Sequence, residues 1–135
     1  MKITEVVEEY LKSIFYLQKQ GQDVSTSSLA EKLRIKDASV TAMIKKLAAN
    51  DYVNYSSHRG VILTDSGKKI ALGIIRKHRI LEIYLNENLN VSKDKVNSEA
   101  EKLELYLSED IMTKIENILG ERKFGIHGER IPVSN

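Results

Sequence analysis

The sequence contains no cysteine and no tryptophan, and its 135 residues include only one proline and seven glycines. The absence of cysteine excludes disulfides, thiolate metal ligands and a cysteine nucleophile, and it is typical of proteins in a reducing cytoplasm. No apolar run is long enough to span a bilayer, and no charged and then apolar leader is present, so we expect a cytoplasmic protein without a membrane partner. The sequence also lacks a glycine-rich phosphate loop and a Ser/His/Asp or Cys/His set, so we expect neither an enzyme nor a small-molecule substrate.

The charged residues are divided unevenly along the chain. Residues 1–79 hold 14 Lys and Arg against 8 Asp and Glu, whereas residues 80–135 hold 7 against 11. A basic half beside an acidic half favours a nucleic-acid surface joined to a carboxylate-rich second unit. Chance variation in surface charge is the alternative explanation.

Residues 24–67 carry the most informative local pattern. A short helix with polar caps, Ser25 to Leu33, is followed by a break at residues 35–37 and a second helix from about Ala38 to Ala49. Two β-prone runs, Tyr52 to Tyr55 and Val61 to Thr64, then flank a Ser-Ser-His-Arg-Gly segment. This order predicts a helix-turn-helix followed by a β-hairpin wing, in which the second helix can enter the major groove of DNA.

Helical periodicity covers most of the remaining chain. It predicts helices over residues 3–20, from Thr64 to about Asn86, from Ser92 to Leu107 and from Ser108 to Gly120, followed by a coil over residues 124–133. We therefore predict a mainly α protein with a winged helix-turn-helix domain (residues 1–74) and a helical dimerisation domain with a C-terminal coil (residues 75–135). The apolar face of the long helix, from Ile74 to Leu85, is expected to help form the dimer.

A set of motifs in a fixed order makes this architecture specific. They are Glu-Glu-Tyr-Leu-Lys-Ser-Ile (8–14), Ser39-Val40-Thr41, Arg59-Gly60-Val61 with Leu63-Thr64 and Gly67, His78 with Glu82, Glu99 with Glu101 and Glu104, and His127 with Ile131-Pro132. The chain resembles the iron- and manganese-dependent repressors typified by the diphtheria toxin repressor and the manganese transport regulators. The resemblance covers nearly all residues and implies a homodimer that binds a double-stranded DNA operator, with Mn²⁺ or Fe²⁺ as corepressor, and represses metal-uptake genes. Many relatives carry a third, SH3-like domain, which would begin where this sequence stops.

The resemblance also implies which residues contact DNA. The implied set is Thr26, Ser27, Ser39, Thr41, Lys45 and Arg59, of which Arg59 matches a wing-tip arginine. Ala42 stands where some relatives have a longer amide residue, so direct base readout by hydrogen bonding is lost there, although an alanine can still contact a thymine methyl group. The alternative is that these hydroxyls only cap helices and the lysine is only solvated.

Metal ligands are implied in the same way. One site would use Glu9, His78, Glu101 and Glu104, and a second would use Glu82 and His127. Carboxylate and imidazole ligands without thiolate suit Mn²⁺ or Fe²⁺. Four positions depart from the pattern. Gly125 replaces a cysteine of the second site, Leu105 replaces a histidine ligand, Lys12 stands where some manganese regulators have an acid, and Asn97 replaces a histidine used by the diphtheria-type regulators.

These departures leave two interpretations open. In the first, which we favour, a carboxylate-rich site still binds a hard divalent cation, with water filling the gaps. In the second, the Lys12 ammonium neutralises Glu9, Glu101 or Glu104, and the protein is a regulator that needs no metal. A metallohydrolase built around His78 lacks an oxyanion hole and a substrate cleft. A helical dimer that binds only protein would show no salt-dependent DNA binding.

Overall fold

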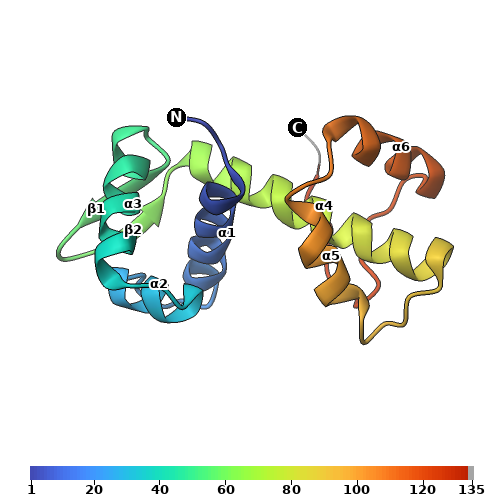
Figure 1. The fold of residues 1–135 in the computed structure, drawn as a ribbon, viewed down its shortest axis with the longest axis horizontal. Coiled ribbons are helices and arrows are strands. Elements are labelled where there is room, and N and C mark those ends of the chain that lie inside the picture. The colour runs from blue at the N-terminus through green and yellow to red at the C-terminus, as the bar shows by residue number, and fades with distance from the viewer. Residues whose placement is uncertain (134–135) are drawn as a thin grey trace. The chain divides into compact units, whose positions relative to one another are not determined.

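The computed structural model describes residues 1–133, which divide into two compact units, Met1–Ala71 and the residues from Leu72 onward. Figure 1 shows the elements that form them. In chain order these are α1 (Glu5–Lys19), α2 (Thr26–Leu33), α3 (Asp37–Ala49), β1 (Val53–Ser56), β2 (Gly60–Leu63), α4 (Asp65–Leu89), α5 (Val96–Glu104) and α6 (Glu109–Leu119). The predicted mainly α class, with a helix-turn-helix and a hairpin wing, is confirmed. None of the described helices is both long and apolar enough to cross a membrane.

Hydrogen bonds from side chains fix the helix starts in the first unit. The Thr4 hydroxyl accepts a hydrogen bond from the Val7 N–H at the start of α1. Ser25 and Ser28 each accept from the other's backbone N–H at the start of α2, which is a capping box. Arg34 ends α2 with a left-handed φ of 58° and so turns the chain toward α3. These local features place the helix-turn-helix where the sequence pattern predicts it.

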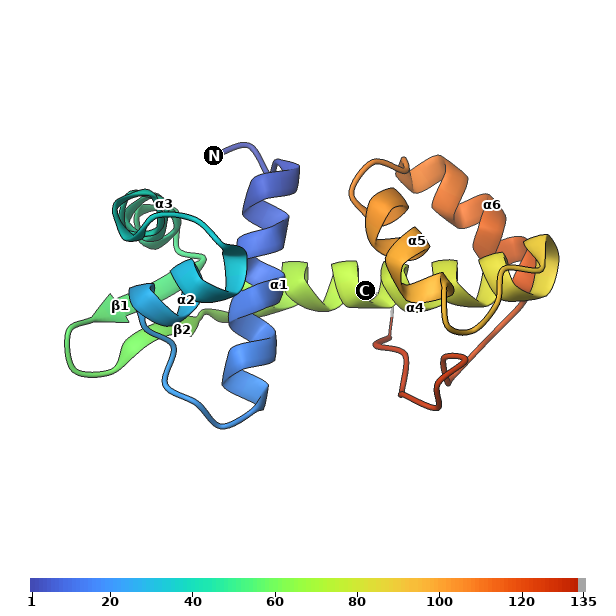
Figure 2. The same cartoon turned by 60° about the horizontal axis from the view of Figure 1, so that its bottom comes forward.

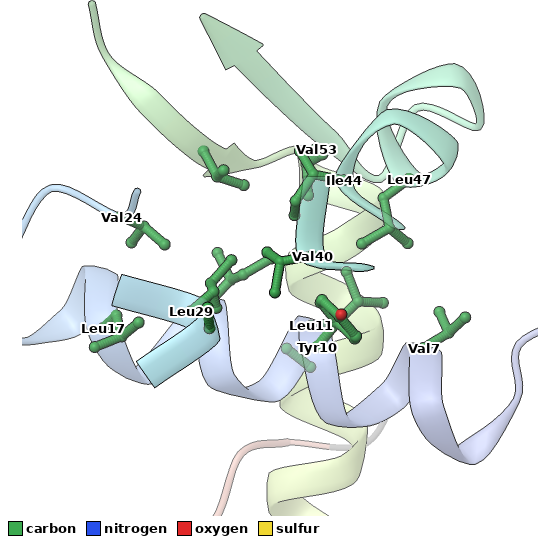
Figure 3. Close-up of a cluster of buried hydrophobic side chains, with 14 residues drawn as sticks. Val7, Tyr10, Leu11, Leu17, Val24, Leu29, Val40, Ile44, Leu47 and Val53 are labelled. Atoms are coloured by element: carbon green, nitrogen blue, oxygen red, sulfur yellow. The ribbon is translucent and has the colours of Figure 1, made fainter. Parts of the chain in front are cut away.

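One apolar core holds α1, α2, α3 and the hairpin together (Figure 3). Leu11 of α1, Leu29 of α2, and Val40 and Ile44 of α3 are fully shielded from solvent. Burying each such side chain contributes roughly 1.5–3 kcal/mol before the entropy cost of folding. Because α3 is held by its apolar face, its polar face remains available to a ligand.

The wing is a two-stranded antiparallel hairpin. Val53 lies opposite Leu63, and Ser56 lies opposite Gly60. Gly60 has a φ of +71°, and a Cβ at this position would overlap the carbonyl oxygen of Val24. Only glycine therefore fits where β2 passes the segment before α2.

The second unit packs the C-terminal part of α4 against α5, α6 and the coil that follows α6 (Figure 2). Its buried core consists of Ile80, Leu81, Ile83, Leu85, Val96, Ala100, Met112, Ile115 and Ile131. Ile131 belongs to the coil, so the coil is an integral part of this core. The α4 face that was expected to meet a second copy is buried within the single chain, because α5, α6 and the coil already cover its residues from Ile80 to Leu85.

Two element boundaries differ from the predicted ones. The helix expected over Ser92–Leu107 is confined to Val96–Glu104. Ser92 starts a separate turn instead, in which its carbonyl oxygen accepts from the N–H groups of Lys95 and Val96. The long helix α4 continues past its predicted end at Asn86 to Leu89.

Candidate DNA-binding surface and metal centre

The residues expected to contact DNA lie on α2, α3 and the wing of the first unit. Ser27, Ser39, Lys45 and Arg59 are exposed, and Thr26 and Thr41 are half-buried. Each of these residues is therefore open to solvent at least in part. All six residues thus have the exposure that contact with DNA requires.

The start of α3 offers hydrogen-bond donors to a phosphate. Lys36 precedes the helix without a side-chain cap, and its carbonyl oxygen accepts from the N–H groups of Ser39 and Val40, which leaves the N–H groups of Asp37 and Ala38 for an acceptor outside the helix. Ala38, Ser39 and Ala42 are exposed and small, so a DNA backbone can approach closely. The carboxylate of Asp37 opposes an anion at this end, so hydroxyls and lysines must supply part of the attraction.

Four of the predicted metal ligands form one polar chain in the second unit, which we name the His78 network. His78 Nδ1 on α4 lies 2.7 Å from Glu104 Oε2 on α5, and its Nε2 lies 3.5 Å from Glu82 Oε1. The other Glu82 oxygen lies 3.2 Å from Nε2 of His127 in the coil. Asn97 adds its Oδ1, which lies 2.9 Å from His78 Nε2. The network therefore connects α5, α4 and the coil.

Burial sets the electrostatics of this network. Glu82 is 4% exposed and Glu104 is 1% exposed. Burial by itself lowers the pKa of His78, but the hydrogen bond and charge of Glu104, the charge of Glu82 and the Asn97 contact together raise that pKa above its ordinary value. A protonated His78 ring can donate from both nitrogens and neutralise part of the buried negative charge.

The other predicted ligands lie outside the His78 network. Glu101 is exposed, and its side chain makes no hydrogen bond or ion pair within residues 1–133. Glu9 belongs to α1 in the first unit, where its carboxylate lies 3.4 Å from Lys12 Nζ. Leu105 forms the C-cap of α5 and contributes no donor atom. The Glu9–Lys12 contact is one of the ion pairs considered for a regulator that needs no metal.

The predicted ligand side chains carry atoms of the kind that bind a divalent cation, although the side chains are not arranged around one. Within residues 1–133, no three His, Asp or Glu side chains converge in a geometry that could hold a metal ion. Carboxylate oxygens and imidazole nitrogens are nevertheless the ligands that Mn²⁺ and Fe²⁺ accept. Both nitrogens of His78 face oxygen acceptors, so coordination by this ring requires loss of a proton and a small side-chain rearrangement.

Sequence reasoning missed the contacts that hold the coil along α4. Arg76 and Arg79 donate hydrogen bonds to backbone carbonyl oxygens of the coil. Arg122 donates two hydrogen bonds of 2.8 Å to Glu87. These contacts place His127 beside Glu82, and a bond from an arginine to a backbone carbonyl leaves no signal in the sequence.

Comparisons with protein families match almost the whole chain. A family model described as the N-terminal DNA-binding domain of iron-dependent repressors matches residues 2–61. A second, described as the metal-binding and dimerisation domain of iron-dependent repressors, matches residues 64–133.

Individual relatives agree with these matches. An uncharacterised helix-turn-helix transcriptional regulator of Methanocaldococcus jannaschii is 35% identical over 114 residues, which cover 84% of this chain and 91% of the relative. The transcriptional regulator MntR of Bacillus subtilis is 31% identical over 116 residues, covering 86% of this chain and 81% of MntR. The structure of the manganese regulator SloR is similar with a TM-score of 0.78 and 33% identity, covering 98% of this chain. The chain spans only 61% of the length of that SloR chain.

Proposed function

The chain belongs to the iron-dependent repressor family of metal-responsive DNA-binding transcriptional regulators, and we propose that it represses metal-uptake genes as a homodimer in the cytoplasm. In this proposal, binding to a two-fold DNA operator requires Mn²⁺ or Fe²⁺. The observation that carries it is the His78 network, in which two carboxylates are almost fully buried beside an imidazole. Buried carboxylates are costly unless a positive charge compensates them, so this arrangement favours a cation.

The ligands are proposed residue by residue. Glu9, His78, Glu101 and Glu104 would hold one ion, and Glu82 with His127 would contribute to a second. A bound ion supplies the positive charge that several carboxylates need in order to stay ionised at short separation. The Glu104 carboxylate binds and orients the His78 ring, and loss of the His78 proton frees a nitrogen for coordination. Leu105 contributes no ligand, so we expect weaker metal binding than in relatives with a histidine at this position.

DNA recognition is proposed for the polar face of the first unit. Ser39 and Thr41 of α3 and Thr26 and Ser27 of α2 would bind phosphates, and Lys45 adds positive charge. Arg59 at the wing would reach the backbone or minor groove. A dimer presents two copies of α3, and their separation determines the affinity for a two-fold operator.

A second candidate is a regulator that needs no metal, and the contact between Lys12 and Glu9 favours it. The ammonium group lies 3.4 Å from the carboxylate that would otherwise be a ligand. Lys12 would then supply in permanent form the positive charge that a metal supplies on demand. The two candidates differ in whether removal of metal changes DNA binding.

Operator affinity with Mn²⁺, with Fe²⁺ and with chelator tests the proposal. A duplex selected by the wild-type protein from a randomised library serves as the probe. We expect wild type to lose affinity in chelator, and Glu104→Gln to abolish the metal-stimulated gain while keeping the fold. Glu121→Gln, an exposed carboxylate outside the His78 network, is the matched control and should respond to metal like wild type. Equal wild-type affinity with and without chelator would refute the metal-dependent proposal.

A double variant separates the two candidates further. If Lys12 replaces the metal, wild type is indifferent to chelator, and Lys12→Glu combined with Leu105→His should create a metal response. The change restores an acid and places an imidazole four residues after Glu101 on α5. Tight Mn²⁺ binding by wild type in isothermal titration that is indifferent to Glu101→Gln and Glu104→Gln would instead move the site to Glu82 and His127.

A further inference from the structure

The outer edge of the wing is attached to the first unit at two points. The N–H groups of Val61 and Leu63 point away from β1 and find acceptors elsewhere. Val61 N–H donates to the backbone carbonyl oxygen of Val24, with an N···O distance of 2.7 Å. Leu63 N–H donates to the side-chain oxygen Oε1 of Gln18, with an N···O distance of 2.9 Å. Gln18 is therefore a side-chain anchor from α1 to an otherwise open strand edge.

The buried side chains of Val53 and Val61 hold the base of the hairpin in the apolar core, and the two anchors fix the outer edge of β2. A two-stranded hairpin is marginally stable by itself. Its tip is exposed, and there the Arg59 N–H donates a hydrogen bond to Ser56 Oγ at 3.0 Å. Arg59 lies four positions before Leu63 in the sequence, and at about 3.3 Å per residue the tip lies roughly 13 Å from the anchor. A tilt of about 10° at the anchor would therefore move the tip by about 2 Å.

We propose that Gln18 is a positioning residue for DNA binding, because its amide sets the angle of the wing and thus the reach of Arg59. The inference rests on the proposed function, in which the wing contacts DNA. Gln18 itself touches no DNA in this scheme and acts through Arg59. Removing its amide leaves the partly buried Leu63 N–H without an acceptor and releases one of the two anchors.

A double-mutant cycle tests the inference. Gln18→Met keeps the length of the side chain and removes the acceptor, and Arg59→Ala removes the wing-tip charge. The matched control is Gln20→Met. Gln20 is the exposed C-cap residue of the same helix, and its side chain makes no hydrogen bond within residues 1–133. Affinity for the selected duplex is measured by fluorescence anisotropy in Mn²⁺, well below the unfolding temperature of every variant.

We expect Gln18→Met to weaken binding about 2- to 10-fold, which corresponds to one lost hydrogen bond. Gln20→Met should bind like wild type. The double variant Gln18→Met with Arg59→Ala should bind like Arg59→Ala alone, because both changes act through the same contact. A purely structural role would make the two losses additive, and additive losses would overturn the inference.

Two further readouts separate failure of the inference from failure of the proposed function. If Arg59→Ala leaves affinity and its salt dependence unchanged, the wing is not part of the interface, and both proposals for the wing fail. If Arg59→Ala weakens binding but Gln18→Met does not, only the inference about Gln18 fails. Amide hydrogen exchange should show faster exchange at Leu63 in Gln18→Met with little change at Val61, and unchanged exchange at Leu63 would also contradict the inference.

Discussion

At the scale of single residues, the His78 ring is held between two carboxylates that solvent hardly reaches. Its Nδ1 lies 2.7 Å from Glu104, and Glu82 and Asn97 lie on the Nε2 side. These contacts raise the pKa of His78 even though burial alone lowers it. A protonated ring and a metal ion are thus competing ways to neutralise the same carboxylates.

This competition predicts how pH changes the stability of the metal-free protein. The folded-state pKa of His78 is raised above its ordinary value of 6.5, so the stabilisation is fully present below about pH 6.5 and is lost as pH rises through the folded-state pKa. In chelator, wild type should exceed His78→Gln in urea midpoint by a larger margin near pH 6 than near pH 9. An equal margin at both pH values would contradict the shift.

Sequence reasoning could name several residues of the site but not their contacts. His78, Glu82, Glu104 and His127 came from the family resemblance, and the structure brings these four together. Their hydrogen-bond pattern depends on burial and on the path of the coil, which no spacing rule describes. Gln18 could not be identified from the sequence for a different reason. Its partner is a backbone N–H group, which every residue except proline has.

At the scale of elements, boundaries followed local chemistry where a cap was present. Ser108 was expected to start α6, and its hydroxyl accepts from the Ile111 N–H. Ser92 was expected to start α5 for the same reason, yet it starts a turn before the helix. The same residue type can cap a helix or begin a turn, and the choice depends on tertiary packing that the sequence pattern does not contain.

Two glycines of α4 should respond to alanine in opposite directions. A Cβ at Gly67 would overlap the backbone carbonyl oxygen of Tyr52, whereas a Cβ at Gly73 would meet nothing within 4 Å. We expect Gly67→Ala to lower the free energy of unfolding by about 1–3 kcal/mol. Gly73→Ala should raise it by about 0.5–1 kcal/mol, because alanine is the better helix former. Urea unfolding measures the free energy of unfolding of both variants. Equal changes in that free energy would show that the backbone at Tyr52 moves away from the added methyl group at little cost.

At the scale of the whole molecule, residues 1–133 form two separate apolar cores, one in each compact unit. The division of charge and the change in motif type predicted two units from the sequence. The surface that would join two copies was harder to predict, because the apolar face of α4 is already used within the chain. Apolar side chains left exposed in the second unit are better candidates, among them Tyr106 (73% exposed), Ile111 (43%) and Ile118 (60%).

Ile111 and Ile118 lie seven residues apart on α6 and therefore share one face of that helix. If this face joins two copies, Ile118→Glu should raise the dimer dissociation constant about tenfold or more, because it would bury an unpaired carboxylate. Asn117→Glu adds the same charge at an exposed polar position of α6 and is the matched control.

A fragment containing residues 1–72 gives an independent check, since the first unit has its own apolar core and should fold alone. Sedimentation velocity should show a dimer for wild type and for Asn117→Glu, and a monomer for the fragment and for dilute Ile118→Glu. A stable dimer of the fragment would place the interface in the first unit. It would also mean that the first unit, and not the second, sets the spacing of the two α3 helices on the operator.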